Sequence, residues 1–198
     1  MKRIGITGSI ATGKSSVLAG FAKAGIPTLS ADAVVADLYA GDARAPVEAL
    51  FPGIVADGQI DRQDLARRLA LDPSGFAQLE AVVHPLVRRK IHDFLEQAER
   101  EGHAAAAVEV PLLFESGYDY GFDIIVVTHV DEAIQKQRIL ARPGMSVEKM
   151  QSLLARQMPQ AEKMKRATWS FDTARPRATI DAEIAQRVAE IETEQGRQ

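Results

Sequence analysis

The stretch Gly8-Ser9-Ile10-Ala11-Thr12-Gly13-Lys14-Ser15 decides the fold, because it matches the pattern G-x-x-x-x-G-K-[ST] at every fixed position. The apolar run Arg3–Thr7 before it is typical of a short buried strand, and the apolar positions of residues 13–24 recur at the spacing of one helix face. This context separates a loop that binds phosphate groups from the alternative, a glycine-containing strand–turn–helix connection without a ligand.

Each fixed residue of this P-loop has a physical role. Gly8 and Gly13 let the backbone turn tightly, so that successive N–H groups converge on an anion, and the following helix adds its positive dipole end. Lys14 places a cation on the β- and γ-phosphates, and Ser15 offers a hydroxyl to Mg²⁺. The expected ATP site comprises Gly8, Ser9, Ile10, Ala11, Thr12, Gly13, Lys14, Ser15 and Ser16.

The remaining sequence predicts an α/β fold, a P-loop core with a parallel sheet flanked by helices. Apolar runs predict further strands at 27–29, 104–110, 123–130 and 168–172, and helical periodicity lies between them at 131–142, 146–158 and 177–194. Residues 31–103 are expected to be helical with no strand, interrupted near Gly41 and Pro46, with further helices beginning at Pro73 and Pro85.

We therefore expect 1–198 to be a single P-loop unit in three parts. Its core is expected at about 1–31, 103–137 and 166–198, with a helical acceptor subdomain at about 32–102 and a lid at about 138–165. Residues 136–166 hold eight Lys and Arg against two acids in a chain of net charge −3. This segment is either a solvated helical face or a lid that faces phosphate groups.

Composition excludes several classes of function. The 198 residues are 46% hydrophobic and 26% charged, as in soluble globular proteins. The sequence has no cysteine, which excludes thiolate metal sites and disulfides and fits a cytoplasmic location. The negative net charge argues against a nucleic-acid partner, no apolar run approaches the roughly 20 residues of a membrane span, and the Met-Lys-Arg start is not that of a signal peptide.

A P-loop identifies the nucleotide but not the reaction. The sequence contains no asparagine, so it lacks the guanine-reading Asn-Lys-x-Asp of GTPases, and we interpret Asp72-Pro-Ser-Gly75 as a turn that opens a helix. The length, the helical insertion and the basic segment are typical of a small-molecule kinase of the adenylate-kinase type.

From about residue 3 to 190 the sequence resembles the dephospho-CoA kinase family. Besides the P-loop, the resemblance rests on Ser30-Ala31-Asp32, His84-Pro85, Val110-Pro111-Leu112-Leu113-Phe114-Glu115, Gln137-Arg138 with Arg142, and Arg156-Gln157. It implies ATP-dependent phosphorylation of the ribose 3′-hydroxyl of dephospho-CoA, giving CoA and ADP, with Mg²⁺ accompanying ATP. Two alternatives stay open: a kinase for another small acceptor such as a nucleoside monophosphate, and a regulatory module that binds ATP without turnover.

The resemblance also implies residue roles. Asp32 matches the acidic residue proposed as the base, although an aspartate here could instead cap the next helix. Arg142 matches a lid arginine and, with Lys14, is expected to stabilise transferred charge. Glu109 is either a Mg²⁺ ligand through water or a structural partner of an arginine. The expected acceptor contacts, each with an ordinary structural alternative, are Thr7, His84, Arg88, Glu115 and Arg138.

The sequence departs from the family pattern at several positions. Ser9, Ala11 and Ser16 stand where the family has Gly, Gly and Thr, Ser30 replaces an Asp, and the pairs Ala167-Thr168 and Asp172-Thr173 replace Ala-Asp and Asp-Asn. No fixed P-loop position is lost. Ala11 is expected to restrict the loop if its φ is positive.

Overall fold

The computed structural model describes residues 1–196. Contacts divide the chain into two compact units, one formed by Met1–Ser30 with the chain from Leu95 onward and the other by Ala31–Phe94. The first contains β1 (Lys2–Gly8), α1 (Lys14–Lys23), β2 (Thr28–Ser30), β5 (Ala105–Glu109), β6 (Ile124–His129), α6 (Glu132–Leu140), α7 (Val147–Ala155), α8 (Gln160–Lys165), β7 (Trp169–Asp172) and α9 (Arg177–Gln195). Among residues 1–196, no helix has both the length and the apolar character that crossing a bilayer requires.

The first unit is built on a five-stranded parallel sheet in the order β2-β5-β1-β6-β7. The central strand β1 pairs with β5 and β6, where Ile4 lies beside Ala107 and Ile124, and its last residue Gly8 lies beside Thr128. Because all strands run in one direction, their carboxyl ends meet at a single edge, where Gly8 opens the loop to α1. The predicted α/β fold is confirmed, and α8 is a helix that the sequence analysis did not predict.

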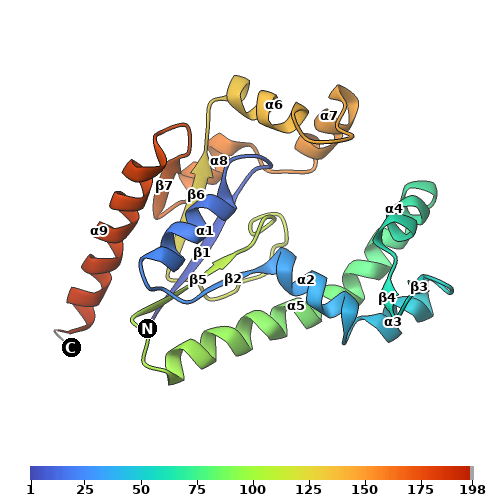
Figure 1. The fold of residues 1–198 in the computed structure, drawn as a ribbon, viewed down its shortest axis with the longest axis horizontal. Helices are drawn as coiled ribbons and strands as arrows, with labels where there is room; N and C mark the ends of the chain where they lie inside the picture. The colour runs from blue at the N-terminus through green and yellow to red at the C-terminus, as the bar shows by residue number, and fades with distance from the viewer. Residues whose placement is uncertain (197–198) are drawn as a thin grey trace. The chain divides into compact units, whose positions relative to one another are not determined.

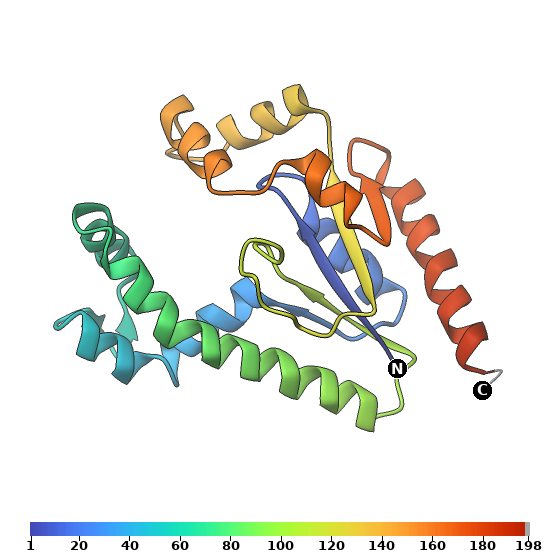
Figure 2. The same cartoon turned by 180° about the vertical axis from the view of Figure 1, so that it is seen from behind.

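Helices cover both faces of this sheet. Figure 1 shows α1 and α9 on one face, and the view from behind in Figure 2 shows α8 on the other. Phe21 of α1 and Ile184 of α9 are fully buried in the same apolar cluster as Ile4 and Ile6 of β1. Gly20 allows the close approach of the two helices, because a Cβ there would lie 2.5 Å from the Ile184 Cδ1 atom.

The second unit contains α2 (Ala31–Ala40), α3 (Arg44–Leu50), β3 (Val55–Ala56), β4 (Gln59–Ile60), α4 (Arg62–Leu71) and most of α5 (Gly75–Arg100). The prediction that this region has no strand is wrong, because β3 and β4 pair antiparallel. Asp57 and Gly58 connect them with φ values of 50° and 76°, and two positive φ values are characteristic of the tight type I′ hairpin turn. Strands of two residues are too short to produce a periodic signal.

Helix α5 is continuous over 26 residues and contains Pro85 in its interior, so the prediction that a separate helix begins at Pro85 is wrong. Proline removes one intrahelical hydrogen bond, the one to the carbonyl of residue 81. Both Ala81 and Pro85 are exposed, so water can satisfy that carbonyl. The apolar stripe of the helix, which includes Val83, Val87 and Ile91, stays buried on both sides of the proline.

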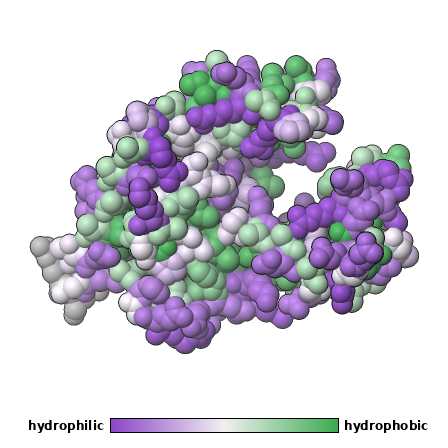
Figure 3. Space-filling model, in the orientation of Figure 1, coloured by the Kyte–Doolittle hydropathy of each residue, from purple (hydrophilic) through white to green (hydrophobic). Residues whose placement is uncertain are grey.

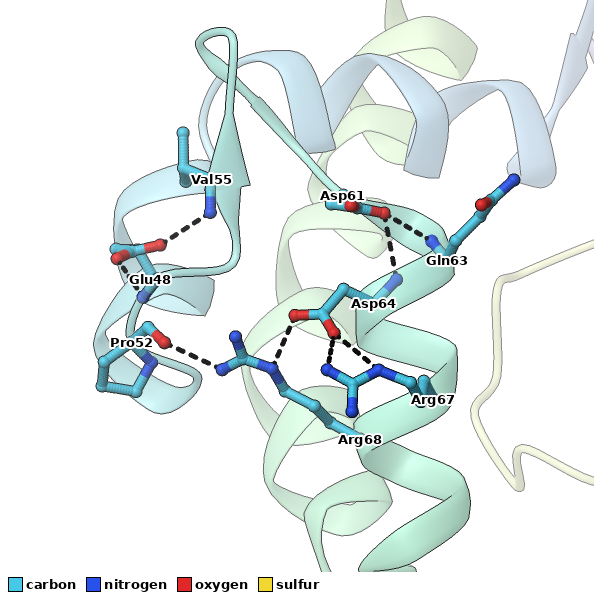
Figure 4. Close-up of polar contacts among 9 residues, drawn as sticks. Glu48, Pro52, Val55, Asp61, Gln63, Asp64, Arg67 and Arg68 are labelled. Atoms are coloured by element: carbon cyan, nitrogen blue, oxygen red, sulfur yellow. Dashed lines mark hydrogen bonds and ion pairs between the residues drawn. The ribbon is translucent and has the colours of Figure 1, made fainter.

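Polar contacts fix the start of α4 within the second unit (Figure 4). Asp61 precedes the helix, and its Oδ1 atom accepts hydrogen bonds from the backbone N–H groups of Gln63 at 2.9 Å and Asp64 at 3.0 Å. Asp64 in turn accepts from the Arg68 Nε atom at 2.7 Å, and the Arg68 Nη1 atom donates to the Pro52 carbonyl at 2.8 Å. The helix is thus both capped and tied to the loop after α3.

Replacing the cap tests this arrangement. Asp61→Ala leaves the N–H groups of Gln63 and Asp64 without their acceptor, so it should lower the free energy of unfolding by about 1 kcal/mol in urea denaturation followed by circular dichroism. Asp61→Asn keeps an acceptor oxygen and serves as the matched control, which should stay close to the unsubstituted protein. Equal stabilities for the two variants would contradict the role of the cap.

Candidate active site

The loop between β1 and α1 requires glycine at both of its fixed glycine positions. Gly8 has a φ of 154°, and a Cβ there would lie 2.3 Å from the Thr128 Oγ1 atom and 2.7 Å from the Thr12 Oγ1 atom. Gly13, the residue before α1, has a left-handed conformation with a φ of 81°, and a Cβ there would lie 3.0 Å from Thr173. The positive φ values favour glycine at both positions, and a Cβ would clash at Gly8 and be tightly crowded at Gly13.

Ala11 also has a left-handed backbone, with a φ of 62°. A non-glycine residue in this region carries a cost of about 1 kcal/mol, so the loop keeps local strain at Ala11. The expectation that Ala11 restricts this loop is therefore met. Such strain persists only where surrounding contacts hold the backbone in place.

Lys14 folds back over the loop that it follows. Its Nζ atom donates to the Ser9 carbonyl at 3.1 Å, and the Thr12 hydroxyl donates to the same carbonyl at 2.8 Å. Ser9 is almost fully buried, at 3% exposure. The ammonium group is therefore held at the loop whose backbone N–H groups begin helix α1, which is an arrangement suited to a phosphate chain.

Ser15 and Glu109 lie side by side at the carboxyl edge of the sheet. The Ser15 hydroxyl donates to Glu109 Oε1 at 3.4 Å, and Glu109 ends β5 with only 3% of its surface exposed. Hydroxyl and carboxylate oxygens are hard ligands that suit Mg²⁺, directly or through water. Among residues 1–196, no three His, Asp or Glu side chains are grouped to hold a metal.

Next to the loop lies a pocket of about 360 Å³ with four arginines in its wall. Its lining residues are Ala11, Gly13, Ser16, Arg138, Arg142, Thr173, Arg175, Arg177 and Ile180. Arg138 is expected from the sequence as an acceptor contact and Arg142 as a lid arginine. Arg175 and Arg177 are not expected, although both follow the last strand at the edge where ligands bind in open parallel sheets. Arg177 reaches the loop region directly, because its Nη1 atom donates to the Ser16 carbonyl at 2.6 Å.

Thr7 and Glu115 hold the segment that follows β5. The Thr7 hydroxyl is fully buried and donates to the Pro111 carbonyl at 3.2 Å. Glu115 Oε1 accepts from the Lys163 Nζ atom at 2.8 Å and from the Met158 N–H at 2.8 Å. Burial raises the pKa of Glu115, but the hydrogen bonds from Lys163 and Met158 outweigh it and lower the pKa overall. Lys163, which the sequence analysis did not single out, has 0% side-chain exposure.

Three predicted residues belong to the second unit. Asp32 is exposed and is the second residue of α2. The residue that precedes the helix, where a capping side chain would lie, is therefore Ser30 and not Asp32. His84 and Arg88 lie four residues apart on α5, which places them on one helix face. Their contacts with an acceptor stay predictions.

The predicted lid combines basic and exposed apolar side chains. Figure 3 shows hydrophobic surface over α6 and α7, at the top of the view, beside hydrophilic surface. Leu140, Val147 and Leu153 of this region are 42%, 47% and 36% exposed, and Arg142, between the two helices, is exposed as well. The role of the segment as a lid stays a prediction.

Comparison with known proteins gives one consistent family. Residues 2–175 match the family model described as dephospho-CoA kinase. Similar proteins include the dephospho-CoA kinases of Rhizobium etli, 48% identical over 96% of this chain and 94% of that protein, and of Brucella melitensis, 44% identical over 96% and 93%.

Among solved structures, a Thermus thermophilus protein aligns with a TM-score of 0.78 at 36% identity, over 96% of this chain and 97% of that one. Dephospho-CoA kinase from Campylobacter jejuni shares the fold, with a TM-score of 0.68 at 24% identity over 96% and 97%.

The Glu115–Lys163 pair can be tested through stability. Glu115→Gln leaves the buried Lys163 without a counter-charge, so it should lower the free energy of unfolding by about 3 kcal/mol. The double variant Glu115→Gln/Lys163→Met removes both charges and should recover most of the loss, as measured by chemical denaturation.

The stability that the Glu115–Lys163 pair contributes should fall as the pH is lowered. Because the pKa of Glu115 is lowered in the folded protein, the pair stabilises the fold above the ordinary glutamate pKa of 4.5 and loses its effect as pH falls through the lower folded pKa. Below pH 4.5 the double variant should therefore lose less stability than the unsubstituted protein. Parallel pH profiles would contradict this account.

Proposed function

Because the chain belongs to the dephospho-CoA kinase family, we propose that its loop 8–16 holds ATP while the terminal phosphoryl group passes to the ribose 3′-hydroxyl of dephospho-CoA. The chain is an ATP-dependent kinase of coenzyme A biosynthesis. The proposal for the site rests on the loop itself, where the Lys14 Nζ atom lies 3.1 Å from the Ser9 carbonyl oxygen, next to the start of α1. We place the reaction in the cytoplasm, because the sequence has no cysteine and the family acts on soluble metabolites.

The residues around the loop suit the charge of a triphosphate. Backbone N–H groups at the start of α1 and the Lys14 ammonium would bind the β- and γ-phosphates. Arg142, in the wall of the arginine pocket, would add paired hydrogen bonds to phosphate oxygens as charge moves to the departing ADP. Phosphoryl transfer depends mainly on such positioning and charge stabilisation.

Mg²⁺ fits the Ser15 and Glu109 pair by donor chemistry. Ser15 would bind the cation through its hydroxyl, and the buried Glu109 carboxylate would hold it through water. When bound with ATP, the ion would neutralise charge on the β- and γ-phosphate oxygens. The protein's own contribution is to keep these two oxygen ligands beside the loop.

We assign the acceptor side to Asp32 and the helical region of about 32–102. The Asp32 carboxylate would accept the proton of the 3′-hydroxyl as that oxygen bonds to the γ-phosphorus and the bond to ADP breaks. His84 and Arg88 would contact the acceptor from α5. A lid at about 138–165 would exclude water, which competes as an acceptor.

An assay of acceptor specificity tests the function. With Mg·ATP, ADP release should be fast with dephospho-CoA and slow with AMP, CMP or no acceptor, and mass spectrometry should detect CoA. Release with AMP or CMP instead would favour a nucleoside monophosphate kinase. ATP binding without release for any acceptor would favour a regulatory module.

A matched pair of variants tests the base. Asp32→Asn removes the proton acceptor without changing shape, so kcat should fall by roughly 10²- to 10⁴-fold while the dissociation constant of ATP is unchanged. Asp37→Asn is the control, because Asp37 is an exposed residue of the same helix with no proposed role. An unchanged kcat in Asp32→Asn would contradict the role of Asp32 as the base and would favour a structural role.

A further inference from the structure

Side chains from distant parts of the sequence donate hydrogen bonds to three successive backbone carbonyl groups of the phosphate loop. The Ile10 carbonyl accepts from the Gln135 Nε2 atom at 2.8 Å, and the Ala11 carbonyl accepts from the Arg138 Nη1 atom at 3.5 Å. The Thr12 carbonyl accepts from the Thr173 hydroxyl at 2.9 Å. All three donors come from residues more than 120 positions away in the sequence.

This pattern of contacts sets the direction of the N–H groups. In a trans peptide the C=O and N–H groups point in opposite directions, so fixing the carbonyls of residues 10–12 also orients the N–H groups of residues 11–13. Of these, the Thr12 N–H donates to the Ser9 carbonyl at 3.4 Å within the loop. The N–H groups of Ala11 and Gly13 then point to the side of the loop away from the three donors. Ala11, with its φ of 62°, lies in the middle of this run, where an unsupported backbone would relax.

The Gln135 side chain can adopt a single amide orientation here. Its Nε2 atom donates to a carbonyl, and its Oε1 atom accepts from the Gln160 Nε2 atom at 3.0 Å. Gln160 Oε1 in turn accepts from the Val130 N–H at 3.1 Å. A carbonyl only accepts and a backbone N–H only donates, so both ends of this chain of amides fix the orientation of each glutamine. Gln135 is 5% exposed, which shields these bonds from water.

Thr173 and Arg138 form the other half of this support. The Thr173 hydroxyl accepts from Arg138 Nη1 at 2.9 Å while it donates to the Thr12 carbonyl. Arg138 Nη2 also donates to the Thr173 carbonyl at 2.9 Å. The two residues therefore fix each other as well as the loop, and the proton of the hydroxyl is directed to the loop.

We propose that Gln135, Arg138 and Thr173, the carbonyl clamp, are positioning residues that turn the loop N–H groups toward the phosphates of ATP. The inference rests on the proposed function of the loop as the phosphate site. The clamp acts through the peptide groups of residues 10–12 and not by contact with the reacting atoms. It gives Arg138 a role other than the acceptor contact expected from the sequence.

Thr173 provides a clean test. Thr173→Val keeps the shape but removes the hydroxyl, so kcat/KM for ATP should fall about tenfold or more, since small displacements of a positioned phosphate are costly. The KM for dephospho-CoA should change by less than about twofold, because the acceptor side is not altered. Thr173→Ser keeps the hydroxyl and should restore most of the lost kcat/KM. Thr193→Val is the matched control, because the Thr193 hydroxyl donates to a helix carbonyl in α9 at 2.8 Å.

Gln135→Glu is the second variant, since it replaces the donor to the Ile10 carbonyl by an acceptor of the same shape. It should also lower kcat/KM for ATP while leaving KM for dephospho-CoA unchanged, in protein that thermal denaturation shows to be folded. If this variant does not fold, the Thr173 pair decides alone.

Two results would overturn the proposal: unchanged kinetics in Thr173→Val, or a Thr173→Ser variant as impaired as Thr173→Val. If the unsubstituted protein itself transfers no phosphate to dephospho-CoA, the proposed function fails, and this outcome is distinct from a loss limited to the variants.

Discussion

The N–H groups of one short loop can converge on an anion only if the carbonyl groups of the same peptides point away from it. In this protein the parallel sheet brings the supporting side chains to the loop, because it places β1 between β5 and β6 and brings the carboxyl ends of all five strands to one edge. Glu109 from β5, Thr128 from β6 and Thr173 after β7 therefore surround a loop that follows β1. Position in the sheet, and not proximity in sequence, determines which side chains support the site.

The basic segment of the first unit also has a structural role. The segment from α6 to α8 is basic, yet one of its cations, Lys163, is fully buried and paired with Glu115. Met158, in the same segment, donates its N–H to the same carboxylate, while the neighbouring Gln157 side chain accepts from the Ile10 N–H at 2.8 Å. Two adjacent residues thus connect the basic segment to the phosphate loop and to the segment after β5.

The sequence predicted those parts of the fold and site that depend on local patterns. Gly8, Gly13, Lys14 and Ser15 are recognisable because their spacing alone defines the loop, and the strands of the sheet are long enough to show apolar runs. Gln135 and Thr173 could not be predicted, because their partners lie more than 120 residues away and a glutamine or threonine carries no signal of its own. The Asp57-Gly58 hairpin was missed although its turn signal was present. Pro85 was wrongly expected to begin a helix, because a proline can lie inside a helix where the surrounding residues, here Ala81 and Pro85, are exposed.

The central position of β1 has a consequence for biosynthesis. This strand is translated before its partners β5 and β6, which emerge about 100 residues later, and Thr173 follows Thr12 by 161 positions. At roughly 5 to 20 residues per second, the nascent chain carries Ile4 and Ile6 for on the order of 10 s before a sheet can cover them. The phosphate loop thus leaves the ribosome well before Gln135 and Thr173, the side chains that hold its backbone.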